Sequence, residues 1–324
     1  MKRTQVLLFL LLLPLLLFYS CKKDLLRFHT IQKLQSYTTT DDLSCVKFLN
    51  DTLGFIVGGQ RTTHAFMLQT KDGGYTWHQG DFVNTGKSLF CITQSPSGIV
   101  YFSGYDSKII YSEDTGRHWF TQDLPIWKIF TDITYPTATQ GIAIGGISYD
   151  EGWLVHLNQS GQITTWDSLP YQLNKIKMAD EHIGYICGYG TIIKTTDGGQ
   201  TWLPLSVGQD NFYGIDILSP NSIWVCGYGG SIIHSTDEGA TWQKMRNGND
   251  FTKPAYYLRD IVFKDAANGW AVGDDGLLIH TDDAGNHWEQ YDKFTSAALR
   301  SIAICKNGDL IVCGDNGSIY RLSN

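Results

Sequence analysis

Two aspartates of this sequence have the residue type and the setting for acid–base chemistry. Asp132 and Asp260 each stand two residues after a large apolar residue and directly before an isoleucine. A glycoside hydrolase needs two carboxylates about 5–10 Å apart, one as the acid and one as the nucleophile or base. Lys175 occupies the equivalent position between them in the repeat described below. Asp132, Lys175 and Asp260 therefore form one candidate set, either for ligand contact or as solvated polar residues.

Arginine and tyrosine supply a second group of candidates. Arg259 and Arg300 stand at equivalent positions in neighbouring repeats, where paired guanidinium groups suit a carboxylate or sulfate. Ordinary surface solubility explains the two arginines about as well. Tyr189 and Tyr228, like Tyr105, fall at a predicted turn, where their rings suit either stacking on sugars or capping the turn.

The histidines do not indicate a metal site. His234 and His280 share one position of the repeat, and His118 and His287 share another. A zinc or iron site needs ligands that converge in one pocket, whereas these positions are spread over separate repeats. We expect neither a metal nor another cofactor.

A repeat of about 40 residues organises these positions. The segment Thr195–Trp202 (TTDGGQTW) recurs at Thr70–Trp77, Ser112–Trp119, Ser235–Trp242 and Thr281–Trp288, and a degenerate copy without Asp lies at Asn158–Trp166. Each copy fits a hairpin turn in which Asp accepts backbone N–H groups, Gly takes a positive φ and Trp folds back.

Seven repeats of four strands predict an all-β, seven-bladed β-propeller. The seventh unit begins near Leu299 and ends at Asn324 before a fourth strand can form. We expect the segment Phe28–Tyr37 to supply that strand and to close the ring, which removes the exposed sheet edges.

The cysteines divide into two groups. Cys187, Cys226 and Cys313 share the position before the turn glycine, where other repeats have Val, Ile or Ser, so we expect them to be small core residues. Cys45 and Cys91 share a position on neighbouring innermost strands. A disulfide between them is one alternative in an exported protein, and free buried thiols are the other.

The first 27 residues form a leader and a tether. Lys2 and Arg3 precede an apolar run that is too short to span a bilayer, so residues 1–20 indicate a signal peptide. Cys21 follows a small residue, as in the lipobox of bacterial lipoproteins, and predicts fatty acylation such as palmitate. Ordinary secretion and an uncleaved anchor are the alternatives. Residues 21–27 are then a lipid-anchored tether and residues 28–324 the propeller.

The net charge argues against nucleic acid. Removing Lys2 and Arg3 with the leader takes the formal charge from −7 to −9. A protein that grips phosphates carries a basic stripe, and the mature chain has no basic run longer than Lys22-Lys23.

The repeated turn resembles the Asp-box, or bacterial neuraminidase repeat, of sialidases, sortilin-type receptors and some endo-acting glycosidases. The unit Leu258–Trp288 is similar to that of the photosystem II assembly and stability factor family, and the similarity covers all seven blades. This resemblance implies a propeller that acts by binding. The arginine patch of the photosynthetic members is matched only by Arg259 and Arg300.

A glycoside hydrolase and a glycan-binding protein are the competing classes. The resemblance to sialidases implies an early Arg-Ile-Pro motif, which this chain lacks. Asp132 and Asp260 are the candidate carboxylate pair for hydrolysis, but they belong to blades 3 and 6, across the ring. Glycan binding without cleavage would use Tyr189 and Tyr228.

These observations favour a non-catalytic, membrane-anchored scaffold, an accessory subunit of an outer-membrane protein assembly. Lys22 after Cys21 resembles lipoproteins that are released to the outer membrane. A short tether would hold the ring near a partner in the same membrane, facing either the periplasm or the cell exterior.

Overall fold

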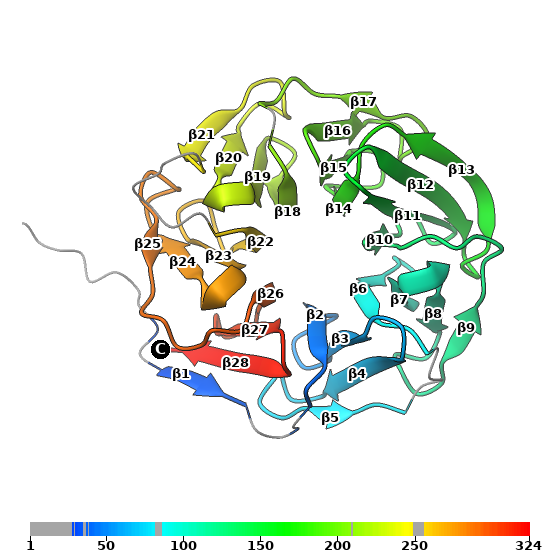
Figure 1. Ribbon diagram of the computed structural model, residues 1–324, viewed down its shortest axis with the longest axis horizontal. Coiled ribbons are helices and arrows are strands. Elements are labelled where there is room, and N and C mark those ends of the chain that lie inside the picture. The colour runs from blue at the N-terminus through cyan, green and yellow to red at the C-terminus, as the bar shows by residue number, and fades with distance from the viewer. Residues whose placement is uncertain are drawn as a thin grey trace, which may run out of the picture.

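The chain folds into a ring of seven blades around a central axis. The computed structural model describes Phe28, Tyr37 and residues 30–34, 39–81, 86–208, 210–248 and 256–324. Seven antiparallel sheets of four strands each make up the ring (Figure 1). The predicted seven-bladed propeller is therefore confirmed. The predicted signal peptide 1–20, the lipidation site Cys21 and the tether 21–27 lie outside the described residues.

In blades 1 to 6 the strands run in chain order from the axis to the rim, and in blade 7 the outermost strand is β1. Blades 1 to 3 comprise β2 (Asp42–Phe48), β3 (Gly54–Gln60), β4 (His64–Thr70), β5 (His78–Gln79); β6 (Leu89–Gln94), β7 (Val100–Gly104), β8 (Ile109–Ser112), β9 (Phe120–Gln122); β10 (Asp132–Thr134), β11 (Gln140–Ile147), β12 (Glu151–Asn158), β13 (Ile163–Leu169). Blades 4 and 5 comprise β14 (Leu173–Met178), β15 (Gly184–Gly188), β16 (Thr191–Thr195), β17 (Leu203–Pro204); β18 (Phe212–Ser219), β19 (Ser222–Gly227), β20 (Ile232–Ser235), β21 (Gln243–Arg246). Blades 6 and 7 comprise β22 (Leu258–Phe263), β23 (Gly269–Gly273), β24 (Leu278–Thr281), β25 (Glu289–Gln290); β26 (Leu299–Ile304), β27 (Leu310–Gly314), β28 (Ser318–Ser323), β1 (Thr30–Lys33).

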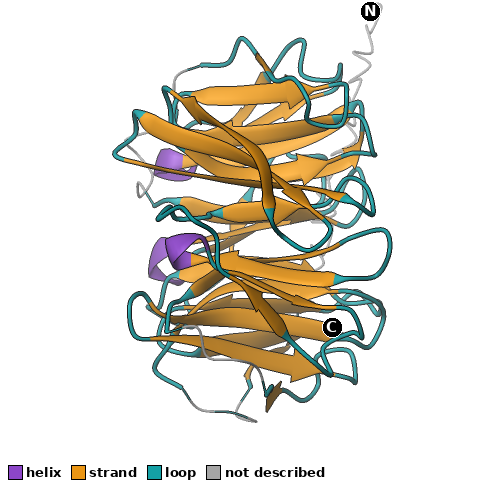
Figure 2. Cartoon of the chain, turned by 90° about the vertical axis from the view of Figure 1, so that its right-hand side faces the viewer, coloured by secondary structure: helices purple, strands orange, loops and turns teal. Residues whose placement is uncertain are grey.

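Short 3-10 turns mark one face of the ring. They join the second and third strands of blades 2, 5 and 6 as η1 (Tyr105–Ser107), η2 (Tyr228–Gly230) and η3 (Asp274–Gly276). Figure 2 shows short helices at one side of the disc, and we call this side the upper face. The repeated Asp–Gly–Trp turns join the third and fourth strands.

The repeated turn is held by its own polar side chains. In blade 4 the N–H and the hydroxyl of Thr201 donate to the two carboxylate oxygens of Asp197, at 2.9 and 2.6 Å. These bonds lower the pKa of Asp197 to about 2, so the carboxylate stays ionised. Gly199 has φ +90°, and a Cβ there would lie 2.2 Å from Ile142. The aspartate and the glycine thus have the structural roles predicted for them.

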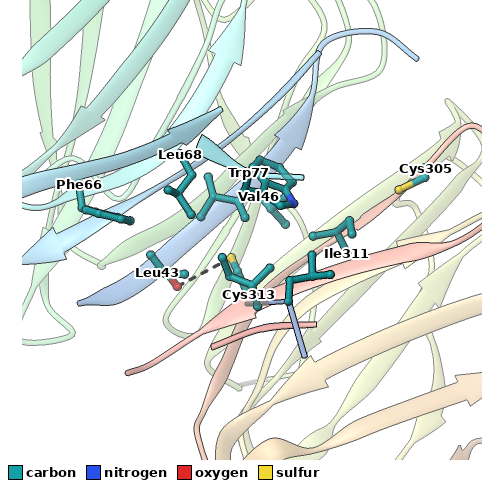
Figure 3. Packing of buried hydrophobic residues seen from close by; sticks show 11 residues of the cluster. Leu43, Val46, Phe66, Leu68, Trp77, Cys305, Ile311 and Cys313 are labelled. Atoms are coloured by element: carbon teal, nitrogen blue, oxygen red, sulfur yellow. Dashed lines mark hydrogen bonds between the residues drawn. The ribbon is translucent and has the colours of Figure 1, made fainter. Parts of the chain in front are cut away.

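The core lies between neighbouring blades. Figure 3 shows the junction of blades 7 and 1, where Leu43 and Val46 of β2 pack with Ile311 and Cys313 of β27. Cys187, Cys226 and Cys313 are fully buried, as predicted. All six cysteines in the described part of the chain are free, so Cys45 and Cys91 form no disulfide.

The N-terminal strand closes the ring. β1 pairs antiparallel with β28, with Thr30 opposite Ser323 and Lys33 opposite Tyr320. Just before β1, Phe28 is buried with its ring 5.7 Å from that of Trp270 in blade 6. The closing strand predicted within Phe28–Tyr37 is therefore confirmed.

Deleting the chain through Lys33 is expected to destabilise the whole ring. The deletion removes the fourth strand of blade 7 and leaves the edge of β28 unpaired, which promotes association. We expect the loss of this strand to cost about 3 kcal/mol of unfolding free energy. The melting temperature should then fall by about 10 °C, since each kcal/mol shifts it by roughly 2–4 °C in large domains. A chain that begins at Phe28 is the control, and equal melting temperatures for the two chains would contradict closure by β1.

Candidate functional site

The innermost strands meet around a central cavity. Its volume is about 500 Å³, and Asp132, Lys175 and Asp260 lie in its wall together with Cys45 and Ser301. All five share one position of the repeat, directly before an apolar residue of the innermost strand. The structure thus brings the first candidate set to the axis of the ring.

Both carboxylates of that set are engaged in hydrogen bonds between blades. Asp132 accepts the N–H of its neighbour Ile133 at 3.0 Å and that of Ile176, in the next blade, at 3.0 Å. Asp260 likewise accepts the N–H groups of Ile261 and Ile302, each at 3.1 Å. Neither carboxylate is more than 9% exposed. Each carboxylate therefore links two innermost strands.

The charges at the axis are balanced within the wall. Burial raises the pKa of Asp260, and the Lys175 ammonium opposes that rise. Burial also lowers the pKa of Lys175, but the carboxylates of Asp132 and Asp260 raise it by more. Lys175 therefore remains a cation, 3.9 Å from Asp132. Lys175 thus offsets part of the negative charge of the two buried carboxylates, whose oxygens already accept backbone N–H groups.

Asp216 forms a third link of this kind, which the repeat does not predict. Asp216 lies two residues further along its strand and accepts the N–H of Phe263 in blade 6 at 2.7 Å. It also pairs with Lys177. Ser301 completes the pattern, because its hydroxyl accepts the N–H of Val46 at 3.3 Å and so connects blade 7 to blade 1.

The two arginines bind carboxylates of their own blades. The Nε and Nη2 atoms of Arg259 donate to the two oxygens of Asp274 at 2.8 and 2.9 Å. Arg300 forms the same bidentate pair with Asp315. Each arginine is thus paired with an aspartate from the turn of its own blade, and binding of a ligand carboxylate or sulfate by the two arginines stays a prediction.

Tyrosine side chains line a groove on the upper face. Tyr189 and Tyr228 are 44% and 47% exposed, and both belong to it. The groove has a volume of about 800 Å³ and crosses blades 3 to 5, with one side chain from the loop before blade 6. Its other tyrosines are Tyr149, Tyr171, Tyr213 and Tyr257.

Backbone bonds between turns and loops hold the floor of the groove. The N–H of Tyr189 donates to the backbone carbonyl of Gln172 at 2.9 Å, and the N–H of Tyr228 donates to the backbone carbonyl of Asn211 at 2.9 Å. Gln172 also donates its N–H to the carbonyl of Tyr149 at 3.1 Å. The turns of blades 3, 4 and 5 are thereby fixed to the loops that enter blades 4 and 5.

A chain of amide side chains continues beneath the tyrosines. The amide of Gln172 donates to that of Asn174 at 2.9 Å, and Asn174 donates to Asn211 at 3.0 Å. Asn211 in turn donates to the hydroxyl of Tyr213 at 2.7 Å. A rigid floor lowers the entropy cost of ordering the site when a ligand binds.

Neither a metal site nor a membrane-spanning helix is found in the parts of the chain that the structure describes. No three His, Cys, Asp or Glu side chains gather there in a way that would hold an ion. No helix in those ranges has the length and apolarity to cross a bilayer.

Comparison with known proteins places the fold among other β-propellers. Residues 159–251, from the outer part of blade 3 through blade 5, match the family model described as Photosynthesis system II assembly factor YCF48. YCF48 from Cyanidioschyzon merolae is 17% identical with a TM-score of 0.68, over 90% of this chain and 98% of that one. This chain is a β-propeller that resembles the photosystem II assembly factors.

Other propellers share the architecture with different roles. A structure of YCF48 bound to D1 peptide is 16% identical with a TM-score of 0.70, over 91% of this chain and 96% of that one. A catalytically inactive virginiamycin B lyase from Staphylococcus aureus is 15% identical with a TM-score of 0.67, over 91% and 99%. None of the curated proteins matches the sequence. At these identities the likeness establishes the fold, which hosts both binding proteins and enzymes.

Replacing Asp132 or Asp260 by Asn is expected to weaken folding. An asparagine keeps one acceptor oxygen, so one of the two backbone N–H groups loses its partner, at a cost of about 1–3 kcal/mol. Denaturant unfolding measures this loss. Asp167→Asn on the exposed face of β13 is the control, and a change within about 0.5 kcal/mol is expected there. Unchanged stability of both axial variants would contradict the linking role.

Proposed function

We propose that this protein is a non-catalytic, lipid-anchored scaffold that binds a protein partner of the outer membrane through the tyrosine groove of its upper face. The observation that carries the proposal is the groove itself. Three exposed or half-exposed rings from successive blades, Tyr149, Tyr189 and Tyr228, lie on a floor fixed by hydrogen bonds. Tyrosine is enriched at the centres of protein interfaces because it buries much area with few rotatable bonds.

Two further observations support a binding role over hydrolysis. The only carboxylate pair nominated for catalysis, Asp132 and Asp260, accepts backbone N–H groups on both oxygens of each residue. In addition, the similar propeller YCF48 has been solved bound to D1 peptide. We infer that the present chain uses the same architecture to hold a segment of a membrane protein.

The anchor is the second part of the proposal. The leader 1–20 and the small residue before Cys21 support lipidation, and Lys22 supports release to the outer membrane. Only a few residues separate Cys21 from Phe28, which packs against Trp270 of blade 6. A ring tethered this closely favours a partner in the same membrane.

Affinity purification from native envelopes tests the scaffold. The tagged full chain is expected to bring down an outer-membrane protein in stoichiometric amount. The double variant Tyr189→Ala, Tyr228→Ala should lose most of that partner, because each truncated interface anchor costs roughly 2 kcal/mol or more. Cys21→Ser should move the chain to the aqueous fraction.

Phe120→Ala is the matched control for the tyrosine variants. Phe120 is 48% exposed on β9, at the rim and outside the groove, so its truncation should leave the partner bound. Recovery of a lone monomer that cleaves or binds a polysaccharide would contradict the proposal and favour the glycan alternative.

A further inference from the structure

The tyrosine groove carries an unbalanced negative charge. Asp150 is exposed at one side and forms no hydrogen bond or ion pair within the described residues. Asp210 lies further along, and one of its oxygens accepts the N–H of Asn211 at 2.7 Å. The described residues that line the groove include no Lys or Arg.

One end of the groove already shows how its tyrosines bind a cation. The guanidinium of Arg259 lies 4.8 Å from the ring centre of Tyr213 and 5.0 Å from that of Tyr257. Asp274 neutralises this arginine through its bidentate pair. Two tyrosine faces and one carboxylate thus make a complete cation site, filled by the chain itself.

The other end has the same components without a cation of its own. The rings of Tyr149 and Tyr189 lie 4.7 Å apart and are tilted by 40°. Asp150 follows Tyr149 in the sequence, and Asp210 accepts the N–H of Gly190, beside Tyr189, through its backbone carbonyl at 2.6 Å. No Lys or Arg of the described ranges stacks on either ring, in contrast to Tyr213 and Tyr257.

The turn that presents Tyr149 departs from the other blades. Ser148 and Tyr149 have φ values of 57° and 71°, in the left-handed region. Elsewhere in the described chain this region is occupied by glycine or by small or acidic residues and asparagine, never by an aromatic residue. A bulky residue in this region is unfavourable, and such backbone strain is concentrated at binding sites. The blade repeat gives no reason for it.

We propose that the Tyr149–Tyr189 end of the groove binds the Lys or Arg side chain of an extended peptide segment of the partner. The inference rests on the proposed protein-binding function and specifies the chemistry of the bound segment. The cation would lie against the two rings, with Asp150 and Asp210 as its counter-charges. A neutral glycan would leave both carboxylates without a counter-charge, so the charge favours a basic peptide.

Selection of peptides from a random display library tests this chemistry. The detergent-solubilised full chain is the bait, at low salt, where exposed charges interact most strongly. We expect the selected peptides to share one Lys or Arg. The double variant Asp150→Asn, Asp210→Asn should bind the best of them about tenfold more weakly, as measured by fluorescence anisotropy.

A second peptide and a second variant isolate the interaction. In a second peptide, norleucine replaces the shared Lys or Arg. Wild type and the double asparagine variant should bind this neutral peptide equally, because it has no charge to pair with Asp150 or Asp210. Asp292→Asn, an exposed acidic residue outside the groove, should bind the basic peptide like wild type.

The outcomes separate this inference from the function on which it rests. Selection of neutral or acidic peptides, or equal binding by the asparagine variant, would overturn the cation site and leave peptide binding intact. A failure to select any peptide, with retention on a polysaccharide column that Tyr149→Ala abolishes, would overturn both.

Discussion

The pairing of β1 with β28 is the constraint on which the ring depends. Blade 7 has only three strands from the C-terminal end of the chain, so the first strand has to complete it. Closure ties residues near position 30 to residues near position 320 and pairs the edge of β28 that would otherwise be exposed. Each of the seven blades then packs against two neighbours, and the loops of the upper face are held at fixed separations. The groove across blades 3 to 5 depends on this.

Polar links along the axis add a second constraint. Aspartates in blades 3, 5 and 6 accept backbone N–H groups of the next blade, and Ser301 does the same between blades 7 and 1. A buried carboxylate is costly unless it is well hydrogen-bonded, and here each oxygen has a partner. The same residues that look catalytic in the sequence thus keep adjacent innermost strands in register. The polar residues at the centre of the ring therefore have a structural role, and the binding surface that we propose lies on the upper face.

The repeat made the fold predictable, because a feature present in every blade is visible within one sequence. It predicted the seven blades, the turn aspartates and the need for a closing strand. It did not predict Tyr149 or Tyr171 in the groove, since these come from loops whose lengths differ between blades, or Tyr257, whose position holds Gln172 and Asn211 in blades 4 and 5. The partners of the arginines could have been predicted from the sequence, because the two blades with Arg259 and Arg300 are also those with Asp274 and Asp315 in the turn. Asp216 was missed because it lies two residues from the shared position.

Site-specific photo-crosslinking in native cells tests most directly whether the upper face is the binding surface. A benzophenone amino acid in place of Tyr189 should crosslink to one envelope protein. The same group in place of Leu203, which is 69% exposed on the outermost strand of the same blade, should give no such product. Crosslinking from Leu203 but not from Tyr189 would contradict the account.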